Sequence, residues 1–154
     1  MRRVLLVCCV TAAFGVLAAG ASAAPITHYH AKLGKTVVAK GGKQRKDASG
    51  RMHARRLPVT DTLLGANGTL GQLKRHVSFN MDPSTGASVA WCDFTLTLKN
   101  VGKFSGRCAG TLMKGYFSGI RTAKSIWGTY KLVAGGTPGV GPHTLDFWVA
   151  GLDG

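Results

Sequence analysis

The sequence predicts an all-β protein, a small antiparallel β-barrel or sandwich of about seven to eight strands with one hairpin disulfide. Two observations carry this prediction. The chain of 154 residues is rich in glycine, with 22, and its 6 acidic residues are all aspartate, so strong helix formers are scarce. Beyond the first 23 residues, short stretches alternate apolar and polar side chains at period two, and turn-forming residues separate them.

The segment 1–23 has the organisation of a secretory signal peptide. Two arginines at 2–3 precede an apolar run at 4–19, and small residues at 21–23 form a cleavage site. The run is shorter than the about 20 residues that a membrane-spanning helix needs. An uncleaved anchor is the alternative interpretation. We expect a mature protein that begins at Ala24 and is secreted to an extracellular or periplasmic space.

The stretch WCDFTLTLKNVGKFSGRC at 91–108 predicts a disulfide-linked hairpin. Alternating apolar residues before and after KNVGK indicate two strands, and Asn100 lies in the turn between them. Folding the stretch about Asn100 places Cys92 opposite Cys108 on one face, as a cross-strand bridge requires. Disulfides persist in oxidising compartments. Two cysteines alone make a poor metal site, and no C-x-x-C motif is present, so we expect a structural bond.

The other strands follow from the same alternation. DPSTG at 82–86 predicts a turn, and GGTPGVGP at 135–142 predicts a longer loop. The sequence Asn-Gly-Thr at 67–69 fits either a hairpin turn, which we prefer, or a glycosylation site. We expect strands at 57–64, 70–81, 87–99, 103–113, 115–123, 125–134 and 143–151.

The residues before this body, 24–56, predict a basic and flexible N-terminal arm, with the barrel domain at 57–154. Residues 26–57 carry nine basic side chains and one acidic one. Only KTVVA at 35–39 resembles a strand, and it would bring the strand count to eight. An arm of this charge can bind an anionic polymer or a membrane surface; a solvated tail that keeps the protein soluble is the alternative. The expected polyanion-binding residues are Lys40, Lys43, Arg45, Lys46, Arg51, Arg55 and Arg56.

The stretch WGTYKLVAGGTPG at 127–139 resembles the strand-and-loop pattern G-T-[YF]-x-[IL]-x-G-G-T-G of allene oxide cyclase-like and dirigent-like proteins. The resemblance covers about thirteen residues, and Pro138 interrupts the T-G step of the pattern. It implies an eight-stranded antiparallel barrel with an apolar cavity. We therefore favour a barrel over a sandwich.

All three tryptophans fall on the more polar face of their predicted strands. Trp91 shares a face with Asp93, Trp148 shares one with Asp146, and Trp127 lies among serine, threonine and lysine. Aromatic rings beside carboxylates and hydroxyls suit a glycan-binding surface, an oligomer interface or a polar-lined barrel cavity for a small apolar ligand. The alternative is that glycine bulges reverse the register or that loops cover these rings. We predict these five residues as a ligand-binding site.

No sequence motif assigns a catalytic residue. The chain lacks a G-x-S-x-G elbow, an H-E-x-x-H helix and a phosphate-binding loop, and titratable residues such as Asp61 and His143 belong to no motif. His28 and His30 lack a third metal ligand nearby, so we expect neither metal nor cofactor. The sequence favours a secreted, non-catalytic module that binds an anionic or glycan-like ligand at the cell envelope. The alternatives are a small isomerase or cyclase with a barrel cavity, and a cationic antimicrobial or inhibitor protein. The oligomeric state is open.

Overall fold

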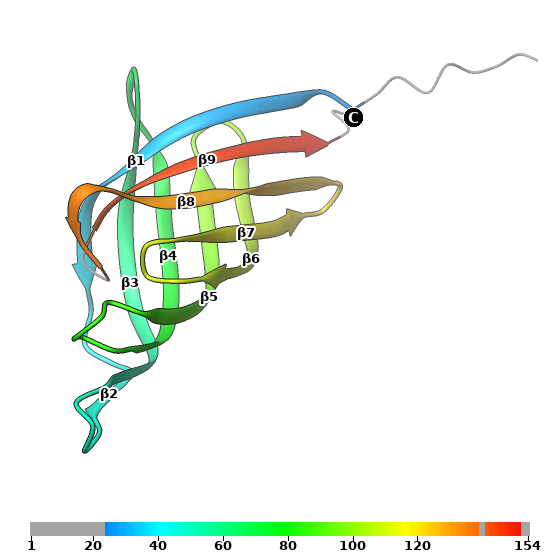
Figure 1. The fold of residues 1–154 in the computed structure, drawn as a ribbon. Helices are drawn as coiled ribbons and strands as arrows, with labels where there is room; N and C mark the ends of the chain where they lie inside the picture. Colours follow the sequence, from blue (N-terminus) through cyan, green and yellow to red (C-terminus); the bar gives the residue numbers. More distant parts are fainter. Residues whose placement is uncertain (1–23, 139–140, 152–154) are drawn as a thin grey trace, which may run out of the picture.

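The computed structural model describes residues 24–138 and 141–151, which form one antiparallel sheet of nine strands (Figure 1). The predicted signal peptide, 1–23, lies outside the described residues. Within them, no helix has the length and apolar character needed to cross a membrane. The strands are β1 (Ile26–Val38), β2 (Lys43–Lys46), β3 (Met52–Gly65), β4 (Gly68–Met81), β5 (Ser88–Leu98), β6 (Gly102–Gly110), β7 (Lys114–Arg121), β8 (Lys124–Thr137) and β9 (Gly141–Gly151).

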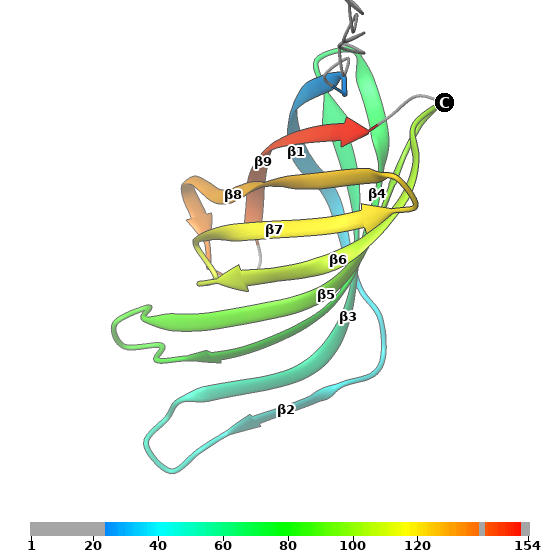
Figure 2. The same ribbon diagram turned by 90° about the vertical axis from the view of Figure 1, so that its right-hand side faces the viewer.

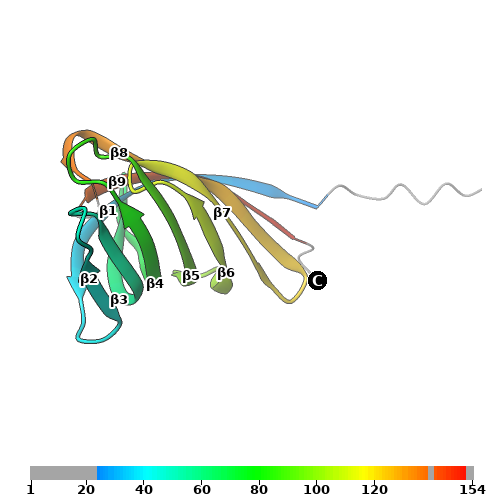
Figure 3. The ribbon, with the colours of Figure 1, turned by 60° about the horizontal axis from the view of Figure 1, so that its bottom comes forward.

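The sheet closes into a ring. From β3 to β9 each strand pairs with the next along the chain, and β1 pairs with β9 on one side and with β3 on the other. Strand β2 pairs with the start of β3 and extends the sheet beyond the ring (Figure 2). Viewed from below, the strands surround a common interior (Figure 3). The predicted all-β antiparallel fold is confirmed.

The N-terminal region differs from the expected flexible arm. Residues 26–38 form β1, which is hydrogen-bonded along 26–32 to β9 and along 32–38 to β3. Its inward side chains Ala31 and Leu33 are buried in the core. Few apolar side chains alternate along β1, because lysine, histidine and glycine occupy many of its positions. Backbone hydrogen bonds to strands on both sides hold β1 in the sheet instead. The folded body therefore begins near Ile26 rather than at 57.

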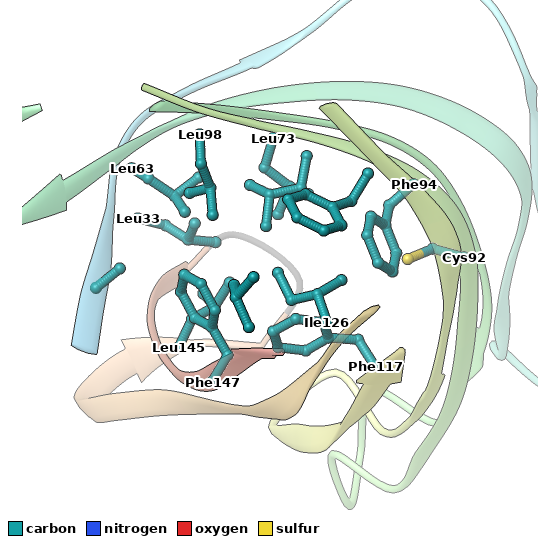
Figure 4. Close-up of a cluster of buried hydrophobic side chains, with 14 residues drawn as sticks. Leu33, Leu63, Leu73, Cys92, Phe94, Leu98, Phe117, Ile126, Leu145 and Phe147 are labelled. Atoms are coloured by element: carbon teal, nitrogen blue, oxygen red, sulfur yellow. The ribbon is translucent and has the colours of Figure 1, made fainter. Parts of the chain in front are cut away.

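The ring interior holds the hydrophobic core (Figure 4). Phe104 and Phe147 are fully buried, and Phe117 lies between Phe94 and Phe147, with ring centroids 5.8 and 6.0 Å away. Burying a side chain of this size stabilises the fold by about 1.5–3 kcal/mol. These aromatic residues come from β5, β6, β7 and β9, so their packing links this arc of the ring through its interior.

Glycine permits the close approach of β6 and β7. Gly106 lies opposite Gly119, and a Cβ on Gly106 would lie 2.0 Å from the backbone oxygen of Ser118. The ring of Phe94 covers both positions, at 2.7 and 3.1 Å from where the two Cβ atoms would be. A side chain here would force the strands apart, which explains why both Phe-Ser-Gly stretches, 104–106 and 117–119, end in glycine.

The hairpin disulfide is confirmed. Cys92 and Cys108 are register partners on β5 and β6, with Cα atoms 5.0 Å apart and the two sulfurs bonded. Asn100 adopts a φ of 60° in the turn, a conformation that asparagine tolerates. Most predicted strand positions are close to those observed. Three differences stand out: β3 begins at Met52 rather than at 57, β2 was not predicted, and β8 continues to Thr137, into the expected loop.

Candidate binding site in the ring interior

A cavity of about 310 Å³ opens at one end of the ring. At this end, which we call the mouth, lie the β4–β5, β6–β7 and β8–β9 turns, and β2 with the adjoining parts of β3, β4 and β5 projects past the other strands (Figure 2). The cavity walls are mainly apolar. They include Leu57, Val77, Phe79, Met81, Leu112 and Pro142.

Two charged side chains lie deep in this cavity. Asp61 of β3 is fully buried, and Arg75 of β4 is largely buried. Asp61 Oδ2 lies 2.6 Å from Arg75 Nη2, and the hydroxyl of Thr36 donates a hydrogen bond to Asp61 Oδ1 at 2.7 Å. Each occupies an inward position of its strand, because Leu63 and Leu73, two residues away, are both buried in the core. The ring therefore encloses an ion pair within its apolar walls.

The Arg75 guanidinium has unused hydrogen-bonding capacity. Its Nε is buried, and no described residue serves as its hydrogen-bond partner. The 2.6 Å contact with Asp61 lacks the geometry of a hydrogen bond, so Asp61 Oδ2 is also left without one among these residues. A buried unsatisfied donor costs about 1–3 kcal/mol. A ligand atom that accepts a hydrogen bond from Nε would remove this cost.

His143 and Tyr130 also line the cavity. The Tyr130 hydroxyl donates to the backbone oxygen of Thr111 at 2.8 Å, and His143 Nε2 lies 2.9 Å from that of Leu112. Because a carbonyl only accepts, Nε2 carries the proton and Nδ1 is an acceptor. Burial lowers the pKa of His143 and raises the pKa of Tyr130, so both are neutral at neutral pH. Arg75 Nε is thus a donor in the cavity, and Asp61 Oδ2 and His143 Nδ1 are acceptors.

Three of the five predicted ligand-binding residues come together, but on the outer face of the ring. Trp127 of β8 and Trp148 of β9 are register partners, and His28 of β1 is the register partner of Trp148. The His28 ring stacks on Trp148 with centroids 4.8 Å apart, and His28 Nε2 is hydrogen-bonded to Asp146 Oδ1. We call His28, Trp127, Asp146 and Trp148 the outer aromatic patch.

The other two predicted residues lie on β5, and Trp91 is among the residues that line the cavity. Trp91 and Asp93 are on β5, which β6 and β7 separate from β8. The guanidinium of Arg55 lies 5.0 Å from the Trp91 ring centroid. Asp93 pairs with Arg56 at 3.4 Å and with Arg107 at 3.5 Å. The Asp93 carboxylate is therefore paired with two arginines and lies outside the outer aromatic patch.

The predicted polyanion-binding residues gather at the mouth. All seven are exposed, on β2, on the first part of β3 and on the segments beside them. Asp47, the acidic residue among them, accepts hydrogen bonds from Ser49, Arg51 and His53. These bonds, with His53 first, hold the pKa of Asp47 well below its ordinary value. The Asp47 carboxylate is therefore engaged within its own turn, whereas Arg56 pairs with Asp93 and Arg55 lies over the Trp91 ring.

Sequence reasoning did not assign Arg75 or Tyr130 to a site and left Asp61 and His143 outside any motif. One signal was available: Asp61 and Arg75 stand at apolar-parity positions of their strands, in LPVTDTL and LKRHVSF. In the described part of the chain, no group of three or more His, Cys, Asp or Glu side chains is placed to hold a metal ion.

Comparisons with protein-family models, with curated proteins and with solved structures gave no match.

Proposed function

We propose that this is a secreted, non-catalytic protein that binds a small amphiphilic molecule inside the ring, with a hydrogen-bond-accepting head group at Arg75. The observation that carries the proposal is the buried Arg75 Nε, left without a partner among the described residues, beside an apolar cavity of about 310 Å³. Concave apolar pockets with a few convergent polar groups are typical of small-molecule sites.

The chemistry of the cavity limits the class of ligand. The walls suit an aliphatic or aromatic body, because each square ångström of apolar surface removed from water contributes about 25 cal/mol. Asp61 offsets much of the charge of Arg75, so the head group can be a carboxylate or a neutral carbonyl. His143 Nδ1 adds an acceptor that can receive a proton donor of the head group.

Replacing Arg75 by lysine should weaken amphiphile binding by roughly tenfold or more. Lysine keeps the positive charge beside Asp61 but lacks the planar guanidinium and its Nε donor. A hydrogen bond to a charged group contributes about 1.5–3 kcal/mol, and 1.4 kcal/mol is a tenfold change in affinity. The measurement is displacement of the fluorescent probe 1-anilinonaphthalene-8-sulfonate by decanoate and by decanol.

The matched control is Trp127→Ala, which removes an aromatic ring from the outer face and should leave probe binding unchanged. Arg75→Lys should weaken decanoate binding more than decanol binding, because decanoate makes the stronger contact with the guanidinium. Equal affinities of the Arg75→Lys variant and the parent protein for decanoate would contradict the proposed head-group site. Loss of probe binding in Trp127→Ala would place the probe on the outer face instead.

The outer aromatic patch favours a second candidate function, the binding of a glycan. Trp127 and Trp148 stand side by side on the outer face, and Trp127 remains 37% exposed. Ser118 is the register partner of Trp127 on β7, so a hydroxyl lies next to the ring. Apolar ring faces beside hydroxyl and carboxylate groups match the mixed surface of a sugar.

On this second function, Trp127→Ala should reduce the affinity for soluble cell-wall glycan fragments by about fivefold, equivalent to about 1 kcal/mol of lost aromatic contact. Titration followed by tryptophan fluorescence measures the effect. Tyr116→Ala is the control, because Tyr116 is exposed on the neighbouring strand β7 and lies outside the patch. A glycan that binds the parent and Trp127→Ala equally well would exclude the patch.

A further inference from the structure

Exposed apolar side chains surround the mouth of the ring. Val38, Met52 and Met113 are 61, 36 and 49% exposed, and they come from β1, β3 and the β6–β7 turn. Val38 and Met52 also line the cavity, so the apolar surface continues from the interior onto the rim. Val89, at the start of β5, adds a fourth exposed side chain at this end. A group of exposed apolar side chains around a cavity entrance indicates a surface that binds an apolar partner.

Cations are interleaved with these apolar residues. The exposed basic side chains at this end include Lys40, Lys43, Arg45, Lys46, Arg51 and Lys114. Of the two described acidic residues in the mouth turns, Asp47 is bound by His53 and Asp82 accepts two hydrogen bonds from Ser84 in its own turn. The mouth therefore presents a strongly positive rim with an apolar surface inside it.

We infer that the mouth docks onto an anionic lipid surface. A soluble polyanion would neutralise the rim but would leave Val38, Met52 and Met113 in water. An anionic bilayer supplies both partners, since its headgroups attract the lysines and arginines and its acyl boundary accepts the apolar side chains. The charge complementarity of the rim and the apolar surface within it thus favour a lipid surface over a polymer.

The inference rests on the proposed function and extends it, because the docked face contains the entrance of the cavity. An amphiphile could then pass between the bilayer and the interior without crossing bulk water. The lipid surface becomes both the docking partner and the source or destination of the ligand.

The experiment is sedimentation of the mature protein with vesicles of phosphatidylcholine, with and without phosphatidylglycerol. We expect binding only to the anionic vesicles and its loss as salt is raised. Lys43→Gln with Lys46→Gln should weaken vesicle binding by about tenfold, as should Met52→Ser with Met113→Ser. The matched controls lie at the opposite end: Lys99→Gln with Lys103→Gln, and Ile26→Ser with Ile120→Ser, all exposed in the parent. They should bind as the parent does.

Dextran sulfate serves as the soluble polyanion. The methionine double variant should bind it as tightly as the parent, because dextran sulfate offers no apolar layer. Unchanged vesicle binding of that variant would overturn the inference in favour of a polymer, and so would a parent that leaves anionic vesicles unbound at low salt. Probe binding by the vesicle-free protein tests the cavity separately: docking without probe binding would refute the proposed function and leave the lipid surface as partner.

Discussion

Replacing Asp61 by alanine should lower the free energy of unfolding by about 3–5 kcal/mol, because it leaves the Arg75 charge largely buried without its counter-ion. Asp61 is fully buried, and its two oxygens face Thr36 and Arg75. Interior charges are tolerated only when they are paired, since each costs several kcal/mol to remove from water. Urea denaturation followed by circular dichroism measures the loss.

Two variants separate a buried pair from an ordinary salt bridge. Asp93→Ala removes a carboxylate that is 55% exposed beside two arginines, and it should cost less than about 1 kcal/mol. The double variant Asp61→Leu with Arg75→Met fills the same interior with apolar groups and should recover most of the stability lost in Asp61→Ala. If Asp61→Ala lowers the free energy of unfolding by as little as Asp93→Ala does, water reaches the Asp61–Arg75 pair.

The double variant Asp61→Leu with Arg75→Met also tests whether the buried ion pair serves folding or ligand binding. An apolar replacement that is equally stable would show that the pair is not needed for folding. If the same variant then loses its preference for decanoate over decanol, the charges serve the ligand. Preserved preference would exclude Arg75 as the head-group site.

Most strands could be predicted because their alternation is regular and their turns are marked. Asn100 fixes the β5–β6 register, so Cys92 and Cys108 could be paired without a structure. Only the end of β1, within KTVVA at 35–39, could be recognised, because just Ala31 and Leu33 of its thirteen residues are buried core positions. Its place depends on backbone pairing with both β9 and β3, partners that lie far from it in the sequence.

The interior site was harder to predict than the outer face. Alternation alone indicates that Trp127 and Trp148 share the outward face, but only the register of β8 with β9 makes them neighbours. Asp61 and Arg75 look like surface residues by type, and their inward positions matter only once the ring is closed. Closure by the β1–β3 pairing is a long-range event that local patterns do not encode.

Replacing both Cys92 and Cys108 by alanine should lower the free energy of unfolding by about 2–4 kcal/mol. The bond joins residues 16 positions apart, so it restricts the conformations of the unfolded chain. In the folded protein the β5–β6 pairing already holds the two residues together. A domain of this size typically has about 5–15 kcal/mol in total, so the variant should unfold at a distinctly lower temperature. Calorimetry of the parent and the variant measures the shift.

The disulfide should affect stability and leave ligand affinity unchanged. Cys108 borders the cavity, and both cysteines line a smaller interior space that Arg75 and His143 also line, but the carbon skeleton of alanine preserves this wall. Probe affinity measured at a temperature where the variant is folded should therefore equal that of the parent. Two free thiols detected by alkylation of the native protein would contradict the pairing. Lost probe binding with unchanged stability would instead make the sulfur atoms part of the binding site, because a purely structural bond can alter affinity only by altering the fold.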